Sequence, residues 1–230
     1  MTIPNSSVRQ HVVNSGDILA LVTGPDVYQP LTETAYAVVV AKNELDKLTS
    51  KAGLVLGDFG SGTGQLGLAL KNIFPELTVK LYEKDAAAEK YILENTTTYA
   101  GLAADAVEVN IMDVADINGN TKFDVIISCP PYYADIVKTL PNVSHPHTND
   151  PESAVYGGFK GLEVQTVFLD KAAQTLKTGG FVVVVHARSA KEDISSMLTE
   201  RGFSNITYSQ DPNLSDLMPI VDAGFTVAYK

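Results

Sequence analysis

The sequence has 230 residues and a formal net charge of −10, from 17 basic and 27 acidic side chains. This acidic balance opposes binding to duplex nucleic acid, which depends on lysine and arginine releasing counterions from phosphates. With 45% hydrophobic residues, no apolar run long enough to span a bilayer and a single cysteine, we expect a cytoplasmic globular protein that uses no membrane and no disulfide.

The first part of the chain, residues 1–50, forms a lead-in before the first predicted strand. Within it, the segment from Glu33 to Leu48 is predicted to be a helix, because acids near its start and lysines near its end suit the helix dipole. The first residues lack a basic start followed by an apolar stretch, so we expect no secretion signal. We therefore divide the chain into this lead-in and a domain over residues 51–230.

From Leu54 onward, short apolar runs alternate with helical patterns. Strands are predicted at 54–56, 79–82, 106–111, 123–127, 181–186, 206–209 and 224–229. Helices are predicted at 65–73, 86–98, 162–176 and 191–201. Strands separated by such helices imply parallel βαβ units with helices on both sheet faces, so we predict a doubly wound, Rossmann-like α/β fold. Ligands of such sheets bind beyond the carboxyl ends of the strands.

A glycine-rich loop, Asp58-Phe59-Gly60-Ser61-Gly62-Thr63-Gly64, follows the first of these strands and opens a helix. Glycines allow tight turns and let the backbone approach a ligand closely. The pattern is related to dinucleotide-binding loops, so an NAD-dependent oxidoreductase is one alternative. The acid that opens the loop instead suits the cationic end of S-adenosylmethionine, and the alternating glycine spacing also differs from the dinucleotide fingerprint.

Two further acids follow neighbouring strands. Glu83 ends the second strand, where a carboxylate can accept both hydroxyls of a ribose. Asp113 follows the third strand, where a carboxylate could accept from the adenine amino group. Asp85 is assigned instead to capping the helix that starts at Ala86. Together with the loop, Glu83 and Asp113 predict an S-adenosylmethionine site.

The fourth strand ends in Ser128-Cys129-Pro130-Pro131-Tyr132, whose adjacent prolines restrict the backbone and direct carbonyls into the predicted cleft. The carbonyl of Pro130 could accept from an amine or amide, and Tyr132 can cover a flat acceptor group. A rigid surface turn is the alternative. His145 and His147 lie in a polar segment that we interpret as a loop over the cleft rather than as a metal site. His186 is interpreted as structural.

The chain resembles the HemK/PrmC family of protein-glutamine N5-methyltransferases, which modify peptide-chain release factors, from about Val27 to its end. The family's PRPETE, DLGTGSG and NPPY motifs are similar to Pro30–Ala35, Asp58–Gly64 and Cys129–Tyr132. Its E-P-x-x-A-L-x-G-G-x-D-G-L stretch and LKPGG turn are similar to Asp150–Leu162 and Leu176–Gly180. The resemblance implies the seven-stranded sheet of class I methyltransferases, mostly parallel with an antiparallel last strand.

The resemblance also implies roles for individual residues. Cofactor contacts are expected from Asp58, Gly60, Ser61, Gly62, Gly64, Glu83, Asp113 and Cys129. Cys129, Pro130 and Tyr132 are expected to be catalytic, and Tyr28, Pro30, Pro131 and Tyr133 to contact the acceptor. No metal is expected, because the sulfonium already activates the methyl group.

Two departures from the family keep the acceptor open. The family's Asn, which orients the acceptor amide, is replaced by Cys129, and a thiol is a weak hydrogen-bonding group. Cys129 as a nucleophile is a minor alternative, since no His partner is evident. The family's N-terminal helical domain is also missing, as in shorter archaeal and eukaryotic members that work with a small partner subunit. We therefore expect a release-factor-like protein acceptor, with a small-molecule acceptor and a non-catalytic cofactor-binding subunit as alternatives.

Overall fold

The computed structural model of the chain describes residues 7–14, 17–30, 32–99, 106–139, 150–209 and 223–230. Its main sheet has seven strands in the order β5-β4-β3-β6-β7-β9-β8. Neighbours from β5 to β7 are parallel, whereas β9 is antiparallel to both β7 and β8, which confirms the predicted topology. The strands are β3 Val55–Phe59, β4 Thr78–Glu83, β5 Val107–Ile111, β6 Phe123–Ser128, β7 Leu176–Ala187, β8 Ser204–Ser209 and β9 Ala223–Tyr229.

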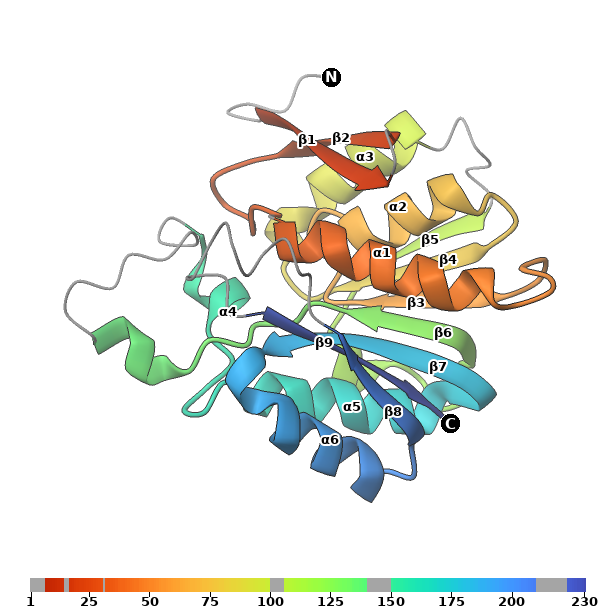
Figure 1. Cartoon of the computed structure of the whole chain (residues 1–230). Helices are drawn as coiled ribbons and strands as arrows, with labels where there is room; N and C mark the ends of the chain where they lie inside the picture. The colour runs from red at the N-terminus through yellow and green to blue at the C-terminus, as the bar shows by residue number, and fades with distance from the viewer. Residues whose placement is uncertain (1–6, 15–16, 31, 100–105, 140–149, 210–222) are drawn as a thin grey trace.

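Helices cover both faces of this sheet (Figure 1). One face carries α1 Thr32–Asp46, α2 Gln65–Ile73 and α3 Glu89–Tyr99, and the other carries α5 Glu163–Thr175 and α6 Lys191–Glu200. Helix α2 has the predicted bounds, and the predicted helix over 86–98 is divided into the 3-10 turn η1 Ala86–Ala88 and α3. Shorter elements not predicted are α4 Glu152–Val155, η4 Val114–Asp116, η5 Asp135–Thr139 and η6 Arg188–Ala190.

The apolar runs of the central strands are continuous because both faces of the sheet are buried. On β6, Val125 and Ile127 belong to the hydrophobic cluster beneath α1, α2 and α3. Ile126, which lies between them, belongs to the cluster beneath α5 and α6. The alternation of side chains along a strand thus divides one apolar segment between two cores.

The lead-in contains an antiparallel pair, β1 Ser7–Asn14 and β2 Asp17–Thr23, which the sequence did not predict. The hairpin lies beside α3 (Figure 1). Helix α1, which was predicted, packs on the sheet, because Val38 and Leu45 are completely buried in the cluster that also contains strand residues. The lead-in helix is therefore part of the layered core.

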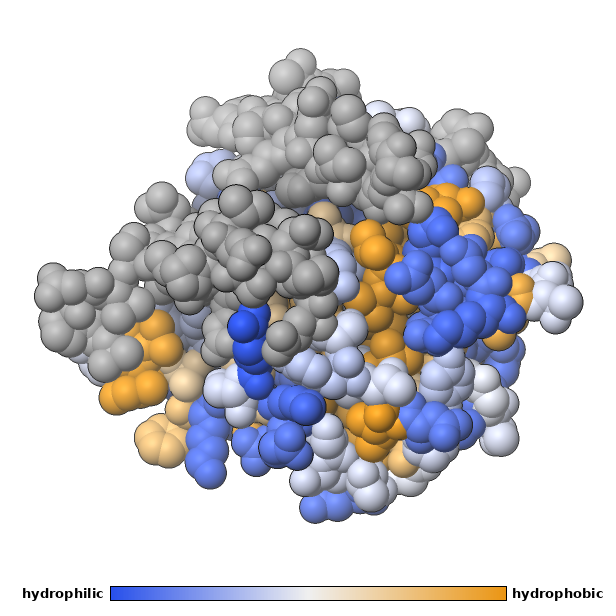
Figure 2. Space-filling view, in the orientation of Figure 1, coloured by the Kyte–Doolittle hydropathy of each residue, from blue (hydrophilic) through white to orange (hydrophobic). Residues whose placement is uncertain are grey.

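Apolar side chains are exposed at several places on the face shown in Figure 2, and one of these places lies near η5. Figure 2 shows an orange patch at the left of the view, over the segment of η5. Ile136 in η5 is 58% exposed, and Phe159 is 75% exposed. The backbone amide of Asp135 donates to Gly158 O at 2.9 Å, so the two segments that carry these side chains lie side by side. Among the described residues, none of the helices has the length and apolar character needed to cross a membrane.

Candidate active site

A large open cavity lies at the carboxyl ends of β3, β4 and β6 and next to the residues that follow β5. It encloses about 1100 Å³, counted out to its open mouth. Its walls include many of the predicted residues: Tyr28, Pro30, Gly60, Ser61, Gly62, Glu83, Asp113, Cys129 and Pro131. The sheet therefore brings together, at one edge, motifs that are as much as 100 residues apart in the sequence, as expected for this fold.

The glycine-rich loop forms one wall of this cavity and is held by the next strand. The amides of Gly60 and Ser61 both donate to Tyr82 O at 2.9 Å. Gly60 and Gly62 have φ values of 71° and 56°, a backbone conformation that side chains with a Cβ rarely adopt. The loop needs glycine at these positions, so its sequence pattern is explained by its path.

Glu83 holds the same loop from the end of β4. Its Oε2 accepts from the amide of Gly62 at 2.8 Å, and its Oε1 accepts from the amide of Asp85 at 2.8 Å. Burial raises the pKa of the Glu83 carboxyl, although these amide hydrogen bonds oppose the rise. Glu83 thus presents a preorganised carboxylate to the cavity, at the predicted position.

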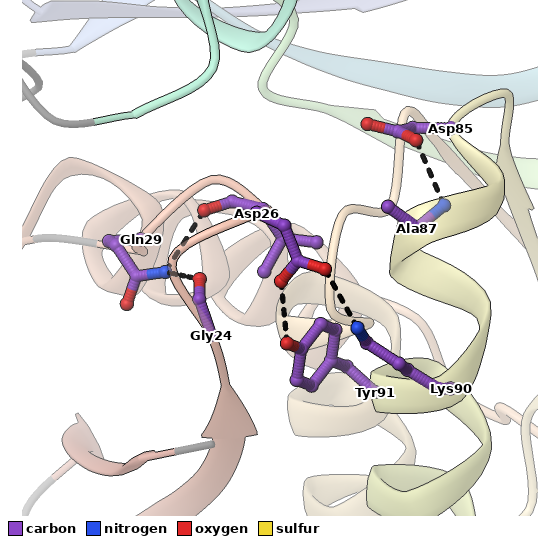
Figure 3. A network of polar contacts seen from close by, with 8 residues as sticks. Gly24, Asp26, Gln29, Asp85, Ala87, Lys90 and Tyr91 are labelled. Atoms are coloured by element: carbon purple, nitrogen blue, oxygen red, sulfur yellow. Dashed lines mark hydrogen bonds and ion pairs between the residues drawn. The ribbon is translucent and has the colours of Figure 1, made fainter. Parts of the chain in front are cut away.

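Asp85 and Asp113 both cap short turns beside the cavity. Asp85 Oδ1 accepts from the amide of Ala87 at 2.9 Å (Figure 3), which confirms its assignment as a cap. Asp113 Oδ1 accepts from the amide of Ala115 at 2.9 Å and leaves its other oxygen for a second contact. Asp113 is half-buried and lines the cavity, so capping and ligand binding are compatible roles.

Asp58 and Gly64 are the two ends of the glycine-rich loop, and neither lines the cavity. Asp58 Oδ2 accepts from the amide of Gly67 at 2.8 Å, and its buried Oδ1 has no hydrogen-bond partner among the described residues. Burial raises the pKa of the Asp58 carboxyl to about 7, the Gly67 amide opposes this, and the Glu83 carboxylate adds to it. The sequence predicted that Asp58 contacts the ligand directly. Because Asp58 does not line the cavity, the structure gives no such contact.

A second cavity of about 210 Å³ adjoins the first at the predicted acceptor loop. Pro130, Tyr132 and Tyr133 line this second cavity and not the first. Four residues line both cavities, namely Tyr28, Cys129, Pro131 and Ala154. These shared residues mark the place where groups bound in the two cavities would meet.

The Cys129 thiol is desolvated and remains protonated. Burial and the nearby carboxylate of Glu33 raise its pKa well above the ordinary value, and a hydrogen bond with Thr34 opposes the rise. A thiol acts as a nucleophile through its thiolate, so this environment does not activate Cys129. The minor alternative of a nucleophilic cysteine therefore has no support from the site.

Residues from the start of α1 complete this junction and were not predicted as site residues. Glu33 is completely buried, and its Oε1 accepts from the hydroxyl of Tyr28 at 2.6 Å. Burial and Glu33 raise the pKa of Tyr28 well above its ordinary value. The PRPETE-like segment included Glu33 and Thr34, but only its proline was assigned a role. Helix α5 contributes Val164, Val167 and Phe168 to the larger cavity, and nothing in their apolar spacing distinguished them from core residues.

The acceptor loop is fixed by the glycine-rich segment at 157–161. The amide of Tyr133 donates to Val155 O at 3.1 Å, and the amide of Gly157 donates to Tyr133 O at 2.9 Å. A Cβ on Gly157 would overlap with the carbonyl oxygen of Pro131, and one on Gly161 with that of Tyr132. The stretch that resembles the family's G-G-x-D-G segment is therefore the support of the acceptor loop.

Of the three histidines considered in the sequence analysis, the structure describes His186. His186 is completely buried, and its Nε2 lies 2.8 Å from the hydroxyl of Thr226 on β9, which confirms its structural role. His145 and His147 lie outside the described residues.

Comparison with known sequences finds methyltransferases. Residues 41–145 match the family described as the methyltransferase small domain. The release factor glutamine methyltransferase of Mycolicibacterium smegmatis is 30% identical over 212 residues, which cover 90% of this chain and 68% of that protein. The enzyme of the same name from Geobacter sulfurreducens is 26% identical, with coverage of 89% and 69%.

Comparison with solved structures finds the same fold. A T. thermophilus 16S rRNA methyltransferase, solved with AdoMet and guanosine, is similar with a TM-score of 0.66 at 16% identity. The similarity covers 99% of this chain and 51% of that one. A SAM-dependent O-methyltransferase from Thermotoga maritima has a TM-score of 0.58 at 18% identity, covering 89% of this chain and 66% of that one.

Proposed function

Because the chain belongs to the family of release factor glutamine methyltransferases, we propose that it methylates the side-chain amide nitrogen of a glutamine in a release-factor-like protein. It is a methyltransferase, and its cofactor is S-adenosylmethionine. The observation that carries the proposal is the pair of adjoining cavities, which share Tyr28, Cys129, Pro131 and Ala154.

The residues of the larger cavity fit S-adenosylmethionine. Its lining combines apolar side chains with a few polar groups, as small-molecule sites do. Glu83 would accept from the ribose hydroxyls and Asp113 from the adenine amino group, while the backbone of Gly60, Ser61 and Gly62 lies along the ligand. Asp58 Oδ1 is buried and has no hydrogen-bond partner among the described residues. Its negative charge would favour a ligand whose cationic end lies near the glycine-rich loop. The similarity to methyltransferases opposes the NAD alternative.

When bound, S-adenosylmethionine supplies a methyl group that is already activated by the sulfonium. The chain's own residues then have to align the acceptor nitrogen with it, and such alignment accounts for much of the rate in a displacement of this kind. The carbonyl of Pro130 accepts from the acceptor N–H, and the ring of Tyr132 stacks on Tyr133 with centroids 5.1 Å apart. Tyr28, Pro30, Pro131 and Tyr133 would complete the acceptor's surroundings.

A protein acceptor is supported by the surface beside the smaller cavity. Ile136 and Phe159 are large apolar side chains exposed next to the acceptor loop, and contiguous apolar surface of this kind favours contact with a macromolecule. A small-molecule N- or O-methyltransferase is the second candidate, because Cys129 replaces the Asn expected for amide acceptors. A small partner subunit, a cytoplasmic location and exclusion of duplex nucleic acid stay proposals from the sequence.

The proposal is tested with labelled S-adenosylmethionine and unmethylated release factor, with peptide mass spectrometry to find the labelled atom. We expect label on a glutamine side chain, and none on a release factor whose glutamine is replaced by alanine. Label transferred to small amines or alcohols, with the release factor unlabelled, would favour the second candidate. Tight binding of the cofactor without transfer to any acceptor, even with cell extract added, would indicate a non-catalytic subunit.

A further inference from the structure

The lead-in contributes a wall to the larger cavity through the segment between β2 and α1. Val27, Tyr28 and Pro30 line the cavity together with residues of the glycine-rich loop. The segment is folded on itself, because the side-chain amide of Gln29 donates to Gly24 O and to Val27 O, and its Oε1 accepts from the hydroxyl of Thr23 at 2.6 Å. These hydrogen bonds link the start of the segment to its end, so contacts at the start constrain the position of Tyr28.

One such contact is made by Asn95, which is completely buried on α3. Its Oδ1 accepts from the amide of Val22 at 2.7 Å, and its Nδ2 donates to Val22 O at 3.0 Å. The same Nδ2 also donates to Thr63 O at 2.9 Å. A single side chain thus joins the end of β2 to the glycine-rich loop on the other side of the cavity.

A second contact is made one turn earlier on the same helix (Figure 3). Asp26 accepts from the hydroxyl of Tyr91 at 2.6 Å and from Lys90 Nζ at 2.7 Å. Tyr91 and Asn95 are four residues apart and therefore lie on one face of α3. Helix α3 also follows the strand that ends in Glu83, so one element connects the ribose-binding carboxylate, the glycine-rich loop and the lead-in wall.

We infer that Asn95 and Asp26 are positioning residues for the cofactor: through α3 they hold the wall formed by Val27, Tyr28 and Pro30 in register with the glycine-rich loop. This inference rests on the cofactor pocket proposed above. It assigns the lead-in a part in cofactor affinity, although the recognised cofactor motifs all lie after residue 57.

The test uses Asp26→Asn and Tyr91→Phe in the full chain. Asp26→Asn removes the charge of an exposed carboxylate, Tyr91→Phe removes one hydroxyl from a buried ring, and both leave the buried Asn95 intact. We expect each to raise the dissociation constant of S-adenosylmethionine, measured by calorimetry, about fivefold to tenfold. The dissociation constant is the readout, because Tyr28 also lines the smaller cavity and its displacement would change kcat as well. Thr97→Ala is the matched control, since it removes a side-chain hydrogen bond on the exposed face of the same helix.

A double-mutant cycle separates positioning from general stability. In a Tyr28→Ala background the wall is already damaged, so Asp26→Asn should weaken binding by at most about twofold more. A full and independent loss in that background, or unchanged affinity with only a lower melting temperature, would overturn the inference. Glu83→Ala distinguishes the two proposals: if it weakens binding while Asp26→Asn and Tyr91→Phe do not, the positioning role fails alone. If none of the three changes affinity, the pocket assignment fails.

Discussion

Cys129 lies where the two cavities meet, and it is the position at which this chain departs most clearly from the family's acceptor motif. An amide nitrogen is a poor nucleophile because its lone pair is delocalised into the carbonyl. A side chain that accepts from the amide N–H orients that lone pair, and a neutral, desolvated thiol does this weakly. We therefore expect this residue to affect the rate and the choice of acceptor more than cofactor binding.

The first prediction concerns this position. Cys129→Asn should raise kcat for methyl transfer to a release-factor glutamine about tenfold or more, because the amide oxygen supplies the missing orientation. The rate is measured by label transfer at saturating cofactor. Cys129→Ser, which keeps the shape of the side chain, is the control and should stay near the parent rate. No gain from Asn would count against a glutamine acceptor.

Asp58 supports a second prediction, on pH. Its carboxyl has a pKa raised to about 7 in the absence of ligand, so it is largely protonated below pH 7. A cationic ligand favours the ionised form, so the cofactor should bind more tightly as pH rises through about 7 and lose about tenfold in affinity per pH unit below it. Calorimetry from about pH 5.5 to about pH 8.5 measures the dissociation constant of S-adenosylmethionine. Asp58→Asn should bind weakly with a nearly flat profile, and a flat profile in the parent protein would be inconsistent with Asp58 acting on the ligand.

The same shift predicts the opposite trend for stability without cofactor. A carboxyl whose pKa is raised by folding opposes the native state when it ionises. The free energy of unfolding should therefore receive a destabilising contribution that begins above the ordinary pKa of 3.8 and is complete above about 7. Urea unfolding at several pH values, compared between the parent protein and Asp58→Asn, measures this contribution. Parallel profiles for the two proteins would show that the carboxyl is not the source.

At the scale of elements, the acceptor loop depends on the segment that packs behind it. Gly157 has no room for a Cβ against the carbonyl of Pro131, although its φ is not in the region reserved for glycine. Gly157→Ala should therefore displace the loop without straining its own backbone. A displacement of about 1 Å at a reacting group can cost about 100-fold in rate, so we expect kcat to fall by that order.

The cofactor side should be unaffected by this change, because Gly157 does not line the larger cavity. The dissociation constant of S-adenosylmethionine should stay within about twofold of the parent value. Gly119→Ala is the matched control, since no atom would meet its Cβ and its φ is ordinary. Loss of cofactor binding together with kcat would show that the segment supports the whole fold rather than the acceptor loop.

The elements also show which parts of the structure can be predicted from sequence. Helix α2 and the central strands follow from local signals, because the apolar period and the flanking glycines are contained in each segment. The β1–β2 hairpin was missed although β2 carries an apolar run over residues 18–22, because its partner β1 is largely polar and the two strands pair mainly with each other. Turns such as η4 depend on a cap supplied by one side chain, Asp113, whose role is visible only in three dimensions.

At the scale of the molecule, the sheet order explains why the site was predictable in outline. Parallel strands deliver the residues after β3, β4, β5 and β6 to one edge, so Glu83, Asp113 and Cys129 were found by their order alone. The contacts of Asn95 required the packing of the lead-in on α3, which no local pattern contains. The division at residue 50 stays a prediction, and α1 and the wall at 27–30 join the lead-in closely to the domain.

The central claim is methyl transfer from S-adenosylmethionine to a protein glutamine. The most direct test incubates the purified chain with methyl-labelled S-adenosylmethionine and an unmethylated extract of its source cells, and then identifies every labelled species. We expect one dominant labelled protein, a release factor, with the label on a glutamine amide nitrogen. Label confined to small molecules, or no label on any species in the presence of bound cofactor, would contradict it.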